Sequence, residues 1–186
     1  MAKTESTMLP LGTKAPSFSL MDVVTGKAIH LKVEQTFSAT VIMFICNHCP
    51  FVRHINTELS RLANDYIPKG VRFIAINSND IGAYPDDSPE LMKHTAIAHQ
   101  YPFPYLFDET QEVALAYQAA CTPDFYIFDH NLLLVYRGQL DDSRPGNNIP
   151  VTGASIRAAL DNIFENKEIS QLQKPSIGCN IKWKKT

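Results

Sequence analysis

Thr40-Val41-Ile42-Met43-Phe44-Ile45-Cys46-Asn47-His48-Cys49-Pro50 is the stretch that carries the strongest signals for fold and chemistry. Its first six residues are apolar or β-branched without a break, which is typical of a strand covered on both faces in the middle of a parallel sheet. Pro50 suits the first turn of a helix, because its missing N–H needs no partner there. The stretch therefore predicts a strand, a turn with two cysteines, and a helix.

The segment after Pro50 has a single apolar stripe at helical spacing. Its members are Phe51, Ile55, Leu59, Leu62 and Tyr66. The sequence Pro68-Lys69-Gly70 ends this helix, and the apolar run at 71–76 predicts a second buried strand. The two cysteines therefore lie inside a strand–helix–strand unit.

The rest of the chain extends this unit into an α/β fold. We expect an N-terminal β-hairpin over 16–31, a helix over 88–99, a short strand at 105–107, a helix around 113–117, a second hairpin over 125–136 and a last helix over 156–164. Residues 1–15 are predicted to be a polar lead-in, and the segment 170–186 an irregular tail. The fold class is then a central mixed sheet of about five strands flanked by helices, with the hairpin at its N-terminal side.

Composition limits the function. The chain has 186 residues, 45% of them hydrophobic, which predicts one domain over 1–186. A net charge of −2 and the lack of a long basic run argue against nucleic acid or a membrane surface as partner. No secretion signal or membrane-length stretch is evident, so we expect a cytoplasmic protein. In that compartment cysteines react or fill space rather than form a disulfide framework.

Cys46 and Cys49 have the spacing of a redox-active pair. A CxxC pair beside a strand–helix unit indicates thiol–disulfide exchange. Amides at the helix N-terminus and the nearby His48 favour an anion, so we expect Cys46 to be reachable from solvent with a pKa below the ordinary thiol value of about 8.5. Two other interpretations stay open: two inert core cysteines, or a zinc site. Zinc is disfavoured because no second pair of ligands is present. No metal and no cofactor are therefore expected.

These motifs together resemble the thioredoxin-like superfamily, in the branch that contains peroxiredoxin-like (alkyl hydroperoxide reductase/thiol-specific antioxidant) proteins and thiol–disulfide oxidoreductases. The resemblance rests on 12–20 with Gly26-Lys27, on 46–50 and on 122–129. It covers about 12–166 and implies a thioredoxin-like fold. It also implies that Thr122 and a cis Pro123 shape the docking of a partner.

The resemblance implies roles for the two cysteines. In thiol–disulfide oxidoreductases the first cysteine attacks and the second resolves, which assigns these roles to Cys46 and Cys49, with His48 tuning the thiolate. In peroxiredoxins the attacking cysteine matches Cys49, and Cys46 would then resolve it. Peroxiredoxins have a Thr or Ser at the position of Cys46 and a Pro at the position of Ile42, so the chain departs from that pattern.

The leading hypothesis is therefore a thiol–disulfide oxidoreductase that works with a cytosolic dithiol reductant and a disulfide substrate. A thiol-dependent peroxidase with an antioxidant role is the alternative, with a peroxide as substrate. A non-enzymatic redox sensor is the third hypothesis. Cys121 and Cys179 are candidate additional redox thiols: Cys179 either pairs with Cys121 or resolves a disulfide at the site, or both are buried and inert.

Overall fold

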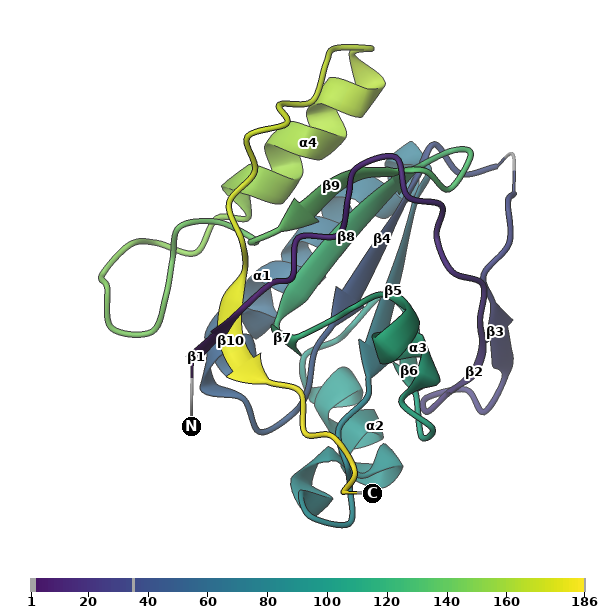
Figure 1. The fold of residues 1–186 in the computed structure, drawn as a ribbon, viewed down its shortest axis with the longest axis vertical. Helices are drawn as coiled ribbons and strands as arrows, with labels where there is room; N and C mark the ends of the chain where they lie inside the picture. Colours follow the sequence, from purple (N-terminus) through teal and green to yellow (C-terminus); the bar gives the residue numbers. More distant parts are fainter. Residues whose placement is uncertain (1–2, 35, 186) are drawn as a thin grey trace.

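A seven-stranded mixed sheet lies at the centre of the computed structural model, which describes residues 3–34 and 36–185 (Figure 1). Its strands are β2 (Ser19–Asp22), β3 (Ala28–His30), β4 (Ala39–Phe44), β5 (Val71–Asn77), β6 (Tyr105–Phe107), β8 (Asp124–Asp129) and β9 (Leu134–Gly138). Their order across the sheet is β3-β2-β6-β5-β4-β8-β9. The β4–β5 and β5–β6 pairs are parallel, and the remaining pairs are antiparallel.

Helices cover the sheet and connect its strands. They are α1 (Pro50–Tyr66), α2 (Pro89–Ala98), α3 (Glu112–Ala116) and α4 (Ala154–Phe164), with 3-10 turns η1 (Ile67–Lys69) and η2 (Pro85–Asp87). Within the described ranges, none of the helices has the length and apolar composition that a membrane span requires.

Strand β4 is buried over its whole length, and its two faces belong to different cores. Val41 and Met43 point into the core that α1, α2 and α4 complete. Ile42 and Phe44 point to the opposite face, where α3 and the N-terminal segment pack. Successive side chains of a strand alternate between faces, so a strand covered on both sides must be apolar throughout. This explains the unbroken apolar run in the sequence.

The predicted α/β fold with a central mixed sheet is confirmed. The strands β6, β5, β4, β8 and β9 form the expected five-stranded core, and the hairpin β2–β3 joins its edge through β6. Helix α2 begins at Pro89, as the sequence Ser88-Pro89-Glu90 indicated. Strand β2 begins at Ser19, later than predicted; Pro16 has no N–H for a ladder.

The prediction of an irregular tail over 170–186 is wrong for β10, and the polar lead-in contains a strand that was not predicted. Three strands form a second, small sheet in the order β1-β10-β7: β1 (Lys3–Glu5), β10 (Ile177–Asn180) and β7 (Cys121–Thr122). All its pairs are antiparallel. Each strand is short and takes its partners from distant parts of the chain. Local periodicity therefore gave no signal for it.

The C-terminal tail approaches other backbone very closely at two glycines, Gly138 of β9 in the central sheet and Gly178 of β10 in the small sheet. A Cβ on Gly138 would lie 2.0 Å from the carbonyl oxygen of Lys174, and a Cβ on Gly178 would lie 2.0 Å from that of Thr122. No real Cβ tolerates such contacts with backbone, so the tail can follow this path only with glycine at both positions. The tail runs past β9 and continues into β10 beside β7 (Figure 1).

Replacing Gly138 should therefore destabilise the protein strongly. Gly138 has φ +127°, so Gly138→Ala adds backbone strain to the clash with Lys174. We expect the free energy of unfolding in urea to fall by at least about 2 kcal/mol. Gly12→Ala is the matched control, because Gly12 has φ +81° and open space around it. Equal losses in the two variants would contradict the close approach of the tail.

Candidate active site

The two cysteines lie where β4 ends and α1 begins. Cys46 follows the strand, and Cys49 is the N-cap residue of α1, with Pro50 at the first helical position. An N-cap side chain faces the unsatisfied N–H groups of the first turn, which favour a negative charge. Cys49, rather than Cys46, therefore occupies the position at which the helix stabilises a thiolate best.

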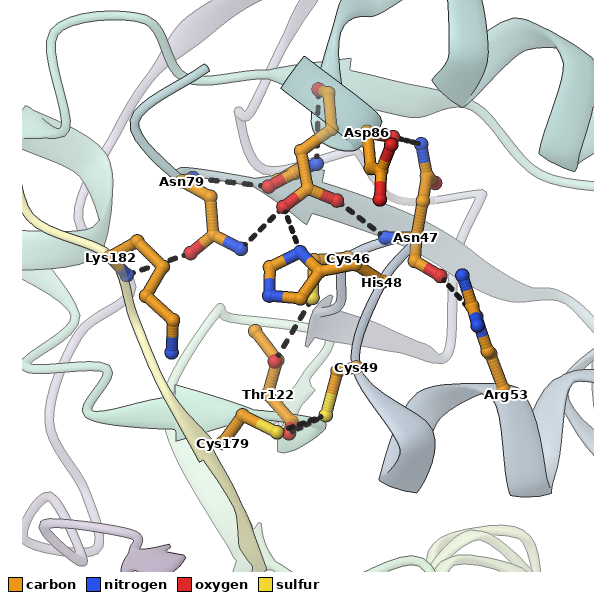
Figure 2. Close-up of polar contacts among 12 residues, drawn as sticks. Cys46, Asn47, His48, Cys49, Arg53, Asn79, Asp86, Thr122, Cys179 and Lys182 are labelled. Carbon is orange, nitrogen blue, oxygen red and sulfur yellow. Dashed lines mark hydrogen bonds and ion pairs between the residues drawn. The ribbon is translucent and has the colours of Figure 1, made fainter. Parts of the chain in front are cut away.

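Both sulfurs contact Thr122, and Cys49 also contacts a third sulfur (Figure 2). Cys46 Sγ lies 3.3 Å from the Thr122 hydroxyl, and the thiol form of Cys49 donates to the Thr122 carbonyl over 3.1 Å. The Sγ atoms of Cys49 and Cys179 are 2.9 Å apart. The Thr122–Pro123 peptide bond is cis, as expected. The loop before Pro123 thus holds the cysteine pair from one side.

Hydrogen bonds to the sulfur lower the pKa of Cys49 to about 5. The largest contribution comes from the side chain of Cys46, and burial opposes it. The side chain of Cys179 and the backbone groups of Val52 and Cys179 contribute further. Since the Thr122 carbonyl accepts only from the thiol form, it works against ionisation. The donors outweigh it, so the pKa of Cys49 is lowered and the pair favours a negative charge on Cys49 over Cys46.

The expected lowering of the pKa of Cys46 is wrong. Its pKa is raised, first because its S–H is used as a donor to Cys49, then because the side chain is buried and the charge of Asp87 lies nearby. The hydroxyl of Thr122 opposes this shift. The sequence did not reveal that the helix N-terminus acts on the second cysteine while the first supplies the proton.

The expectation of a solvent-reachable sulfur is also wrong. Cys46 is 1% exposed and Cys49 is 0% exposed. Both belong to the buried hydrophobic core on the α1 side of the sheet, where Thr122 contacts both sulfurs and the charge of Asp87 acts on Cys46. The site is therefore closed inside a core that is mainly apolar, with a few polar contacts at the two sulfurs. Any reaction with a large partner requires part of this cover to move.

His48 pairs with a carboxylate rather than with a cysteine. Its Nδ1 atom donates to Asp87 over 2.6 Å, and its ring stacks on Tyr84 with centroids 5.2 Å apart. Burial works to raise the pKa of Asp87, but hydrogen bonds from His48, Asn79 and the Asn47 backbone keep it below the usual range. His48 was expected to tune the thiolate by its charge or by a hydrogen bond, and the hydrogen bonds of the described residues link its ring to Asp87 and not to a sulfur.

Sequence reasoning missed the polar chain that connects the tail to this pair. Lys182 N–H donates to Asn79 Oδ1 over 2.8 Å, and Asn79 Nδ2 donates to Asp87 over 2.8 Å (Figure 2). Asn79 and Asp87 belong to the polar loop after β5, at the same sheet edge as Cys46. Polar residues at the carboxyl ends of neighbouring parallel strands were the available signal. Nothing in the sequence pointed to Lys182.

Three of these residues also have donor atoms that a metal ion could use. In the described part of the chain, Cys46, His48 and Asp87 place ligand atoms within 4.8 Å of one another. Two of the three are already engaged with each other, since His48 bonds directly to Asp87. A structural zinc site takes four ligands. The expectation of no metal stays a prediction.

Cys121 and Cys179 lie on opposite sides of their small sheet. In the ladder Cys179 is opposite Thr122, and Cys121 is opposite Asn180. Opposite residues share a face and adjacent residues do not, so the two cysteines point apart. This geometry argues against the predicted Cys121–Cys179 pair, because a disulfide needs converging Cβ atoms. Burial raises the pKa of Cys121, as expected for a thiol packed in the interior.

A family model described as AhpC/TSA family matches residues 11–137. The chain belongs to the AhpC/TSA family. The match contains Cys46, Cys49, Thr122 and Pro123, and it ends before the tail that carries Cys179. A search of curated proteins found no match.

Solved structures show the same fold. A crystal structure of an uncharacterized conserved protein from Geobacillus kaustophilus is 64% identical with a TM-score of 0.97, covering 100% of this chain and 98% of that one. The thioredoxin domain of a thiol-disulfide oxidoreductase from Bacteroides vulgatus is 15% identical with a TM-score of 0.63, covering 81% and 97%. Peroxidoxin BcpB from Mycobacterium tuberculosis is 15% identical with a TM-score of 0.62, covering 85% and 98%. The thioredoxin-like fold is confirmed.

The thiolate of Cys49 should depend on the Cys46 side chain. Cys46→Ala removes the largest contribution that lowers the pKa of Cys49, so that pKa should rise from about 5 toward the ordinary thiol value of about 8.5. A pH titration of thiolate ultraviolet absorbance measures it. Cys121→Ala is the control, since Cys121 is not among the largest contributions to the pKa of Cys49. An unchanged transition in Cys46→Ala would mean that the helix alone stabilises the thiolate.

Proposed function

We propose that this chain is a thiol–disulfide oxidoreductase in which Cys49 attacks a partner disulfide and Cys46 resolves the product. The observation that carries the proposal is the placement of the two side chains together at the N-terminus of α1, beside the loop that precedes Pro123. Membership of the AhpC/TSA family supports redox chemistry in general. The resemblance to thiol–disulfide oxidoreductases assigned the attacking role to Cys46, whereas the charge distribution favours Cys49.

The two thiols have complementary protonation states for this reaction. The Cys49 thiolate attacks one sulfur of the partner disulfide, and the other partner sulfur leaves and takes a proton. Cys46 then loses its proton, attacks Cys49 Sγ and releases the second partner thiol. The site ends as a Cys46–Cys49 disulfide, and the partner has gained two electrons and two protons. A dithiol reductant of the same compartment would restore the two thiols.

The edge of β7 supports a disulfide partner of extended conformation. Thr122 lies beside both sulfurs, and the neighbouring strand β10 already pairs with β7 there. Strand addition at an exposed sheet edge is a common way to bind a peptide segment. Because β10 occupies this edge and the sulfurs are buried, a protein partner gains access only when the tail moves aside. A small disulfide needs a smaller opening.

A thiol-dependent peroxidase is the second candidate, and one observation favours it. A pKa lowered to about 5 favours a Cys49 thiolate at a buried site, which a small peroxide reaches with less movement of the surrounding chain than a protein partner needs. Hydrogen peroxide consumption with a dithiol donor separates the two candidates. Fast turnover that disappears in Cys49→Ser would favour the peroxidase. A non-enzymatic sensor predicts slow exchange with every substrate, and a partner that binds one redox state only.

The roles of the two cysteines are testable with oxidised glutathione, in a Cys179→Ala background that removes the third sulfur. We expect Cys46→Ser in this background to accumulate a glutathione adduct on Cys49, because both thiols that hydrogen-bond to Cys49 have been removed and cannot resolve it. Cys49→Ser should react far more slowly, since its remaining Cys46 is held protonated. Mass mapping of alkylated peptides locates the adduct.

Cys121→Ser in the same background is the matched control. It should form the Cys46–Cys49 disulfide as the parent does, because the thiol of Cys121 donates its hydrogen bond to the Pro123 carbonyl and not to either sulfur. An adduct that forms on Cys46 at full rate in Cys49→Ser would reverse the proposed roles.

A further inference from the structure

Strand β10 places a third sulfur against the cysteine pair. Cys179 is opposite Thr122 in the ladder, on the same face of the small sheet, and its Sγ lies 2.9 Å from Cys49 Sγ. A disulfide bond is about 2.05 Å long, so only a small approach of the two sulfurs separates this contact from a bond. Figure 2 shows the Cys179 side chain directed from β10 toward Cys49.

Several contacts fix β10 in this register. Gly178 lets the strand approach the Thr122 carbonyl more closely than any other residue would allow. Beyond the strand, Lys182 donates from its backbone to Asn79 and from its ammonium to the Asn180 carbonyl over 2.7 Å. Gln111 Nε2 donates to the Lys182 carbonyl over 2.9 Å. The position of Cys179 is therefore set on both sides by buried or half-buried contacts.

We propose that Cys179 is a third redox thiol of this site and forms a disulfide with Cys49 as an alternative to the Cys46–Cys49 disulfide. The inference rests on the proposed function and extends it to a residue outside the matched family region. Cys49 is the central sulfur of the three, since the side chains of Cys46 and Cys179 are both hydrogen-bonded to it.

The exchange is balanced without an external oxidant once the first disulfide exists. The Cys179 thiol loses a proton and its sulfur attacks Cys49 Sγ. The Cys46–Cys49 bond breaks, and Cys46 leaves and takes up a proton. No net electrons are transferred. In the mixed-disulfide state the same attack by Cys179 releases the partner thiol instead, which then takes up the proton.

The Cys49–Cys179 disulfide would change the site in two ways. It ties the C-terminal tail covalently to the first turn of α1, and so holds β10 on the edge beside Thr122. It also returns Cys46 to the thiol state. With the Cys49–Cys179 disulfide, the tail covers the edge of β7 beside Thr122. With the Cys46–Cys49 disulfide, the tail is not tied to α1 and can move away from that edge.

Oxidation of Cys46→Ser with oxidised glutathione tests the proposal directly. We expect an intramolecular Cys49–Cys179 disulfide, seen as the loss of two alkylatable thiols and as a linked peptide in mass mapping. Cys46→Ser/Cys121→Ser is the matched control and should give the same disulfide. Cys46→Ser/Cys179→Ser should instead retain glutathione on Cys49. A stable adduct on Cys49 of Cys46→Ser, with Cys179 still alkylatable, would overturn the inference.

A second variant keeps the test valid if Cys46→Ser folds poorly. Gly178→Ala retains all four cysteines but forces β10 away from Thr122. Oxidised wild-type protein should be a mixture of molecules with a Cys46–Cys49 disulfide and molecules with a Cys49–Cys179 disulfide. Oxidised Gly178→Ala should contain only the Cys46–Cys49 disulfide. Wild-type protein with Cys46–Cys49 alone would overturn the role of Cys179 and leave the proposed function intact. Absence of Cys46–Cys49 from Cys179→Ala would contradict the proposed function itself.

Discussion

The burial of β4 on both faces is the constraint on which the site depends. With α1 and α4 on one face and α3 on the other, β4 cannot shift without exposing a row of apolar side chains. Its end at Phe44 therefore fixes where the chain leaves the sheet. The short turn that follows places Cys49 at the N-cap of α1, and the charge of the site is determined there.

Charge separation within the cysteine pair follows from this placement. Two neighbouring thiols cannot both ionise in a closed pocket, so one proton is shared between them. The helix N-terminus and the donors around Cys49 keep the negative charge on that sulfur, while Asp87 disfavours charge on Cys46. The pairing of His48 with Asp87 engages the Nδ1 atom of the imidazole with a carboxylate rather than with a sulfur. The cysteine with the more favourable environment for attack is thus the second in sequence.

The fold was predictable where a signal is local. The strand before the cysteines, the stripe of α1 and the start of α2 at Pro89 each have a pattern within a few residues. The small sheet was not predictable, because β7 has only two residues and β10 contains a glycine. Its stability comes from pairing between distant parts of the chain, since Cys179 is opposite Lys3 on one side and opposite Thr122 on the other. The contact of Cys179 with the pair depends entirely on that sheet.

The sequence by itself determined that two cysteines, a strand–helix junction and a Thr-Pro turn occur in a thioredoxin-like order, because those features are set by short-range patterns. Only the tertiary structure decided which sulfur is ionised, how far the site is closed, and that the tail brings a third sulfur to Cys49. These depend on desolvation, on hydrogen-bond donors from distant segments and on backbone approach at Gly178. The residues next to Cys49 in sequence do not determine these three features, because each depends on groups that reach the site only when the chain has folded.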